Sequence, residues 1–220
     1  MKVVSLNVGK PESLTFEGKR FISSINRKPA TRAVMLEPLG FDGDRPGDER
    51  VHGGPDKAVC CYSHEHYPYF SRKLGTALDV PAFGENLTTE GMLESEVCLG
   101  DVYQIGRAAV QVSQPRQPCG TLAARNRSKQ LPKWINEMAW GGFYFRVLES
   151  GMVSPGDEIT RLRRIHPGIT IELLCRTLHD KQAPRERLVE LVALPALSHS
   201  WRDKFERRIR VIDGLESDPQ

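Results

Sequence analysis

The stretch Gln114-Pro115-Arg116-Gln117-Pro118-Cys119-Gly120 carries the strongest structural signal in the sequence. It joins a strand-like run, residues 108–113, to a helix-like run that begins at Leu122. Each proline fixes its own φ angle and pushes the residue before it out of the helical region. The stretch therefore predicts a rigid loop that holds Cys119 between a strand and a helix.

All the charged residues in the sequence around Cys119 are positive. No Asp or Glu occurs between residues 107 and 133, whereas the cations there are Arg107, Arg116, Arg125, Arg127, Lys129 and Lys133. Positive neighbours and a helix N-terminus favour the thiolate, which is the nucleophilic and metal-binding form of cysteine. Cys119 is thus a candidate catalytic or metal-binding residue. A half-buried structural cysteine in a basic loop explains the same local pattern equally well.

The composition is that of an ordinary globular protein. The chain has 220 residues, 27% of them charged, and a formal net charge of +3. Such a mild charge does not by itself indicate a nucleic-acid-binding protein. The five cysteines are an odd number without scaffold-like spacing, which favours reduced thiols over a secreted disulfide framework. Because neither a signal-peptide pattern nor an apolar run of membrane-spanning length is present, we expect a cytoplasmic protein that binds neither nucleic acid nor membranes.

Strand patterns dominate the first part of the chain, and helical periodicity follows. Short β-rich runs separated by Gly and Pro turns recur up to Leu162. Beyond Arg163, Thr170 can cap one helix, Pro184 suits the first position of a second, and a serine near residue 198 starts a third. The sequence predicts a mainly β domain over residues 1–162 and a small three-helix domain with its tail over residues 163–220. We expect these helices to pack on the β domain, because about 50 residues make a marginal core alone.

A polar, glycine-rich stretch precedes one of the strands. Val51-His52-Gly53-Gly54-Pro55-Asp56-Lys57 leads directly into an apolar run over residues 58–62. Consecutive glycines let backbone N–H groups approach a ligand, as in an anion-binding nest, and Lys57 adds a positive charge. Loops of this composition are also common as solvated connections. In the apolar run, Cys60 and Cys61 point to opposite faces, and we interpret both as small core residues.

The order of these motifs resembles the MOSC family, named for the C-terminal domain of molybdenum cofactor sulfurase. The three motifs are His52-Gly53-Gly54-Pro55-Asp56-Lys57-Ala58-Val59, Gly84-Glu85-Asn86 and Gln117-Pro118-Cys119. The three-helix end is similar to the YiiM-like branch of that family. The resemblance covers nearly the whole chain and implies a MOSC-type β-barrel followed by a small three-helix domain.

The resemblance also implies a function. It implies that the protein binds the molybdenum cofactor, with Cys119 as the metal ligand and catalytic residue. Members of this branch are associated with reducing N-hydroxylated compounds, such as 6-hydroxylaminopurine-type base analogues, and so with detoxification. The expected activity is that of a molybdenum-dependent oxidoreductase acting on a small N-hydroxylated substrate. Since the chain has neither a ferredoxin-like cysteine cluster nor a pyridoxal-phosphate domain, electrons are expected from a separate flavin or iron–sulfur reductase.

The phosphate of such a cofactor needs cations and backbone donors. We expect the cofactor-binding residues to be His52, Gly53, Gly54, Lys57, Arg116 and Arg146. Two other functions stay open on the sequence alone. Cys119 could carry a persulfide and transfer sulfur to an acceptor, or the protein could bind the cofactor without turnover.

Overall fold

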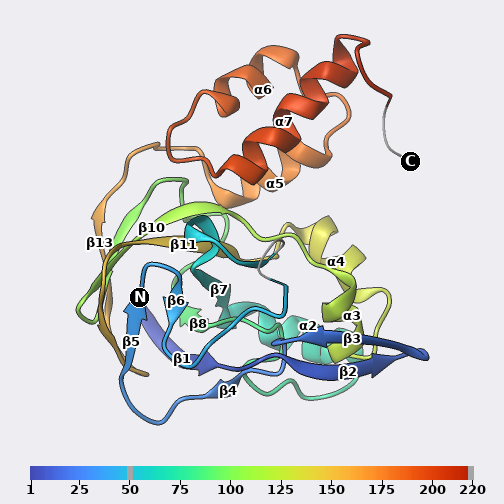
Figure 1. Ribbon diagram of the computed structural model, residues 1–220. Helices are drawn as coiled ribbons and strands as arrows, with labels where there is room; N and C mark the ends of the chain where they lie inside the picture. The colour runs from blue at the N-terminus through green and yellow to red at the C-terminus, as the bar shows by residue number, and fades with distance from the viewer. Residues whose placement is uncertain (49–51, 218–220) are drawn as a thin grey trace.

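The body of the protein is a curved sheet. The computed structural model describes residues 1–48 and 52–217. Eight strands are ordered β13-β9-β10-β11-β7-β8-β1-β4, and all neighbours are antiparallel except the parallel pair β7 and β8 (Figure 1). The strands are β1 (Lys2–Val8), β4 (Lys28–Pro29), β7 (Val59–Ser63), β8 (Leu87–Glu90), β9 (Val102–Ile105), β10 (Ala108–Pro115), β11 (Phe143–Glu149) and β13 (Ile159–Arg163).

The sheet curls until strands far apart in its order meet. Lys2 of β1 and Glu158, beside β13, form an antiparallel bridge. The Val3 N–H donates to the Asp157 carbonyl at 2.9 Å, and the Gly156 N–H donates to the Val3 carbonyl at 2.9 Å. Curling of this kind removes exposed strand edges. The structure therefore confirms a mainly β, barrel-like body.

Two smaller sheets complete the β structure. One contains β12 (Gly151–Val153), β5 (Val34–Glu37) and β6 (Gly40–Phe41) in that order. The other is a hairpin of β2 (Glu12–Phe16) and β3 (Lys19–Ser23), which pair only with each other in the described sheets. Glu17 and Gly18 form the turn with φ angles of 49° and 76°. Positive φ at both turn residues suits the twist of a two-residue hairpin.

Short helices cover the body. They are η1 (Pro55–Lys57), η2 (His64–His66), α2 (Tyr67–Leu74), α3 (Gly120–Arg125) and α4 (Leu131–Met138). The helix-like run after Cys119 is thus two helices. Arg127 has a φ of 49°, which interrupts the run, and Pro132 lies in the first turn of α4, where a missing N–H costs nothing.

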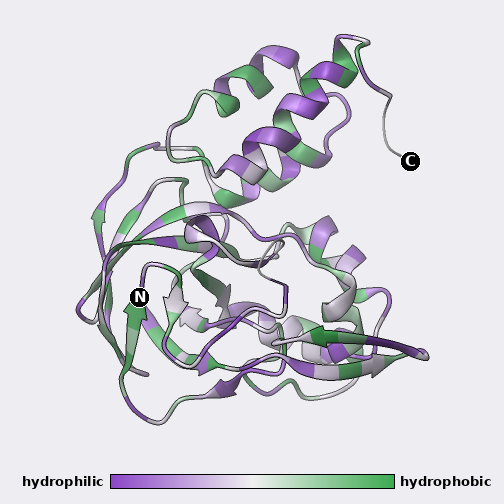
Figure 2. Ribbon diagram, viewed as in Figure 1, coloured by the Kyte–Doolittle hydropathy of each residue, from purple (hydrophilic) through white to green (hydrophobic). Residues whose placement is uncertain are grey.

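Three helices at the C-terminal end pack on the sheet (Figure 1). They are α5 (Ile171–His179), α6 (Arg185–Val192) and α7 (His199–Ile212). Thr170 and Ser198 cap α5 and α7, accepting hydrogen bonds from Leu173 N at 3.1 Å and Trp201 N at 3.3 Å. Figure 2 shows hydrophobic and hydrophilic residues mixed along these helices, and Leu174, Leu188 and Trp201 belong to the same core cluster as residues of the sheet. Among the described residues, none of the helices combines the length and apolarity needed to cross a bilayer.

Candidate functional site

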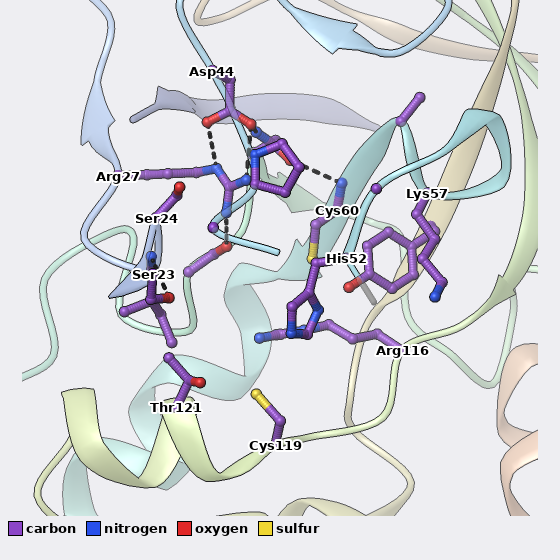
Figure 3. Close-up of a pocket in the computed structure, with 18 of the residues that line it drawn as sticks. Ser23, Ser24, Arg27, Asp44, His52, Lys57, Cys60, Arg116, Cys119 and Thr121 are labelled. Atoms are coloured by element: carbon purple, nitrogen blue, oxygen red, sulfur yellow. Dashed lines mark hydrogen bonds and ion pairs between the residues drawn. The ribbon is translucent and has the colours of Figure 1, made fainter. Parts of the chain in front are cut away.

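A narrow cavity of about 80 Å³ lies where several loops of the body converge. Its walls include Cys119 and Arg116 from the loop after β10, and His52, Gly53 and Lys57 from the glycine-rich stretch. Five of the residues expected at the site therefore come together. Figure 3 shows the Cys119 thiol pointing into the space beside His52 and the Arg116 guanidinium.

Tight backbone contacts fix the loop that carries Cys119. The Arg116 N–H donates to the Gly142 carbonyl at 2.9 Å. A Cβ atom at Gly141 would overlap the Arg116 carbonyl, and one at Gly142 would overlap the Cys61 carbonyl. Only glycine allows β11 to approach this closely. Cys119 itself is extended, with φ −125° and ψ 172°, and immediately precedes α3.

Arg116 is a buried cation that faces the cavity. Its side chain donates to the Phe83 carbonyl at 2.6 Å and forms no ion pair within residues 1–48 and 52–217. Burial acts to lower its pKa, but the acidic groups of Cys60, Tyr144 and Cys119 raise the pKa above its ordinary value. Arg116 is thus permanently charged. Its remaining N–H groups suit a bound anion.

A second arginine of the cavity wall, Arg27, is half-buried and paired with a carboxylate. Its guanidinium donates to both carboxylate oxygens of Asp44, each at 2.8 Å, and to the Gly84 carbonyl at 2.7 Å. Asn86 donates to the same carboxylate at 2.9 Å and accepts from Cys60 N at 3.1 Å. Figure 3 shows this network above the thiol. The Gly84-Glu85-Asn86 motif therefore braces the cavity wall.

The glycine-rich loop contributes weakly basic groups. Burial lowers the pKa of His52, and the positive charges of Arg116 and Lys57 lower it further, against an opposing effect of Asp48. His52 is accordingly neutral near pH 7. The pKa of Lys57 is also lowered, by burial and then by Lys204 of α7, with Asp56 opposing. Val51, the first residue of the motif, lies outside the described residues.

Gly54 and Arg146 are not part of the cavity wall that the structure describes. Arg146 pairs with Asp56 at 2.7 Å and donates to the Ala196 carbonyl at 3.0 Å. Gly54 adopts a φ of 95° immediately before η1. Arg146 thereby joins the glycine-rich loop to the three-helix unit, and direct cofactor binding by either residue stays a prediction.

The basic sequence around Cys119 does not gather around its thiol. Of the six cations counted there, Arg116 alone belongs to the described cavity wall. Arg125 donates to the carbonyls of Pro81 and Ala82. Lys129 pairs with Glu17 at 2.8 Å, and Lys133 approaches Glu137 at 3.8 Å. Arg116 therefore supplies most of the positive charge that this stretch brings to the cavity.

The sequence does not reveal two acidic groups of the cavity, Cys60 and Tyr144. Burial raises the pKa of both, so the Cys60 thiol and the Tyr144 phenol are uncharged near pH 7. Within the described ranges, no three His, Cys, Asp or Glu side chains gather as a metal cage. A metal at this cavity would rely on Cys119 and on ligands that a cofactor brings with it.

Comparisons with known proteins assign the chain to a family. Residues 48–160 match the MOSC domain model, and residues 169–211 match the model of the YiiM-like, 3-alpha helix domain. The chain belongs to the MOSC domain family, with a YiiM-like three-helix domain after the barrel-like body.

Individual relatives agree with this assignment. The chain is 44% identical to YflK of Bacillus subtilis (strain 168), covering 94% of this chain and 93% of that protein. It is 32% identical to Protein YiiM of Escherichia coli (strain K12), covering 87% and 86%. A protein named Reductase from Gibberella moniliformis (strain M3125 / FGSC 7600) is 30% identical over 88% of this chain but only 35% of its own length.

The fold agrees with a solved relative as well. The crystal structure of YiiM from Geobacillus stearothermophilus superposes with a TM-score of 0.81 at 37% identity. The match covers 94% of this chain and 98% of that one. The body and the three helices are therefore both features of the YiiM fold.

Proposed function

We propose that the protein is a molybdenum-cofactor-dependent oxidoreductase that reduces N-hydroxylated compounds, with Cys119 as the protein ligand to the metal. The observation that carries the proposal is the convergence of the Cys119 thiol and the unpaired Arg116 guanidinium on one cavity. A partly exposed thiol beside a buried cation without a carboxylate partner suits one ligand that carries both a soft metal and an anionic group.

The donor set fits such a cofactor. Thiolate is a preferred ligand for soft metal centres, and guanidinium N–H groups bind phosphate with charge-assisted hydrogen bonds. Arg116 would hold the phosphate, and Lys57 and the backbone of Gly53 line the same cavity. MOSC domains as a family are associated with molybdenum cofactor binding, which supports the same assignment.

The reaction balances as R–NH–OH + 2 e⁻ + 2 H⁺ → R–NH₂ + H₂O. The N–O bond breaks, an N–H bond forms, and the oxygen leaves as water. When bound, the cofactor supplies the two-electron redox chemistry. His52 is neutral near pH 7, so one ring nitrogen can donate a hydrogen bond and the other can accept one.

The electrons are proposed to come from a separate flavin or iron–sulfur reductase. The fungal relative named Reductase supports a redox role, although this chain corresponds to only 35% of its length. The rest of that protein has no counterpart here, so its name does not specify the substrate or the donor of this chain.

Replacing Cys119 tests the proposal. Protein made in a host that synthesises the molybdenum cofactor should contain molybdenum and reduce an N-hydroxylated substrate with an artificial electron donor. Cys119→Ser should lose both the metal, measured by elemental analysis, and the activity. Cys60→Ser, which changes another thiol of the same cavity, should retain both. A Cys119→Ser variant with full metal content and turnover would show that the assignment is wrong.

The alternative function, sulfur transfer through a persulfide, also uses Cys119, and mass spectrometry can distinguish it from the molybdenum-dependent reductase. Cys119 is partly exposed, so a sulfur donor could reach it. After incubation with a cysteine desulfurase, a sulfur carrier gains one sulfur atom at Cys119 in the intact mass spectrum. A molybdenum-dependent reductase does not need that adduct for turnover.

A further inference from the structure

A second, wider cavity of about 430 Å³ adjoins the first. The two cavities share four wall residues, namely Ser23, Gly47, His52 and Thr121. One wall of the wider cavity is the β2–β3 hairpin, and another is the start of α3, directly after Cys119. A molecule in the wider cavity therefore lies next to the part of the narrow cavity that holds His52 and Cys119.

The hairpin contributes two aromatic rings to the wall of this cavity. Phe16 and Phe21 are half-buried, and neither belongs to the hydrophobic core clusters or the ring contacts of the described residues. Because Leu14 pairs directly with Phe21, and Phe16 is two residues from Leu14, all three lie on one face of the hairpin. Leu14 packs on the core, whereas the two rings face the cavity.

The position of the hairpin is set at both ends. At its tip, Glu17 pairs with Lys129, which follows α3. At its base, a Cβ atom at Gly47 would lie 2.8 Å from the Ile22 carbonyl oxygen, so the loop before His52 packs directly on β3. Figure 2 shows β3 hydrophilic next to the turn and hydrophobic farther along the strand. The two rings are therefore held opposite α3.

We propose that the wider cavity is the substrate chamber of this enzyme and that Phe16 and Phe21 select planar aromatic N-hydroxylated compounds. The inference rests on the proposed function. Aromatic rings gain most from an offset-stacked or edge-on ring partner, which a planar substrate supplies. The volume lies within the range of small-molecule pockets. Glu17, Lys19 and Asp48 give the wall both signs of charge, which suits a neutral ring.

Two matched substrates test the chamber. Benzamidoxime and acetamidoxime carry the same N-hydroxylated group, but one bears a phenyl ring where the other bears a methyl group. Phe16→Ala and Phe21→Ala should each raise the KM for benzamidoxime about tenfold, leaving the KM for acetamidoxime within about twofold. Phe21→Tyr should restore the wild-type value. Thr15→Ala, on the exposed face of β2 and outside the wall of the wider cavity, should change neither constant.

Three results would overturn the chamber. They are equal changes for both substrates, unchanged constants for both, and loss of molybdenum from the Phe variants, which would mean that the rings hold the cofactor. A readout independent of turnover is benzamidoxime binding to cofactor-free protein by calorimetry, which should weaken about tenfold in each variant. If wild-type protein reduces neither substrate, the proposed function fails. Benzamidoxime binding that weakens in both Phe variants would then still support the assignment of the chamber. Binding of equal strength in wild type and both variants would overturn it.

Discussion

Arg27 and Arg116 both line the cavity, but within the described residues only Arg27 has a carboxylate partner. The Arg27 guanidinium donates hydrogen bonds to both carboxylate oxygens of Asp44, whereas the Arg116 guanidinium donates one to a backbone carbonyl. A buried charge without a partner is costly, so a protein that keeps one usually gives it a ligand. At the scale of single residues, this difference predicts that Arg27 is structural and that Arg116 binds a ligand.

The difference predicts opposite behaviour in two matched variants. Arg27→Met should lower the free energy of unfolding by about 3 kcal/mol, because it leaves the largely buried Asp44 carboxylate without its cation and with only the hydrogen bonds from Asn86 and the Gly9 N–H. Arg116→Met loses one hydrogen bond and removes an unpaired charge, so its stability should change by no more than about 1 kcal/mol. Cofactor content should nevertheless fall in Arg116→Met. Urea unfolding and metal analysis of the two variants would measure this, and equal destabilisation would contradict it.

The titration of His52 provides a pH-dependent test of the positive charge on Arg116. Its pKa is lowered by burial and then by Arg116, so NMR titration should place its midpoint below the ordinary value of about 6.5. Arg116→Met should raise that midpoint, and Arg107→Met, which changes an exposed cation, should leave it unchanged. Below about pH 6.5 the unfolded chain takes up the His52 proton first. Wild-type stability should therefore fall relative to that of His52→Gln as the pH is lowered, and a wild-type stability that rose relative to the variant would contradict the assignment.

At the scale of elements, local sequence predicts most strands and the C-terminal helices. The caps at Thr170 and Ser198 and the helix start near Pro132 depend on nearby residues, so they can be recognised in the sequence. The Arg27–Asp44 pair and the second cavity depend on segments that meet only after folding. For the same reason, the charges near Cys119 in sequence overstate the charges near it in space.

The close approach of the residues before β11 to strand β7 makes a further prediction. Gly142 and Gly156 both have positive φ, at 78° and 86°, so alanine at either costs about 1–2 kcal/mol of backbone strain. At Gly142 the new Cβ would also overlap the Cys61 carbonyl, whereas at Gly156 it would meet open space. Overpacking should cost Gly142→Ala about 1–3 kcal/mol more. Urea midpoints of the two variants would test this, and equal losses would contradict it.

At the scale of the whole molecule, the three-helix unit is continuous with the body. Trp201 and Phe205 of α7 belong to the same hydrophobic cluster as Leu99 and Val112 of the body. Backbone hydrogen bonds cross the junction, including Ser198 N to the Ser113 carbonyl at 3.0 Å. The Arg146 side chain connects Asp56 of the glycine-rich loop to the Ala196 carbonyl. The helices thereby support the loop that carries His52 and Lys57.

A shared core predicts that both parts unfold together. Trp201 reports on the helices, and Trp134 and Trp140 report on the body, so two variants isolate the signals: Trp201→Phe, and Trp134→Phe combined with Trp140→Phe. In each variant, the urea transition seen by tryptophan fluorescence should coincide with that seen by far-UV circular dichroism, because one cooperative core unfolds in a single step. A fluorescence transition of Trp201 that preceded the circular dichroism transition would show that the helices unfold on their own. The Arg146 connection would then be too weak to couple them to the cavity.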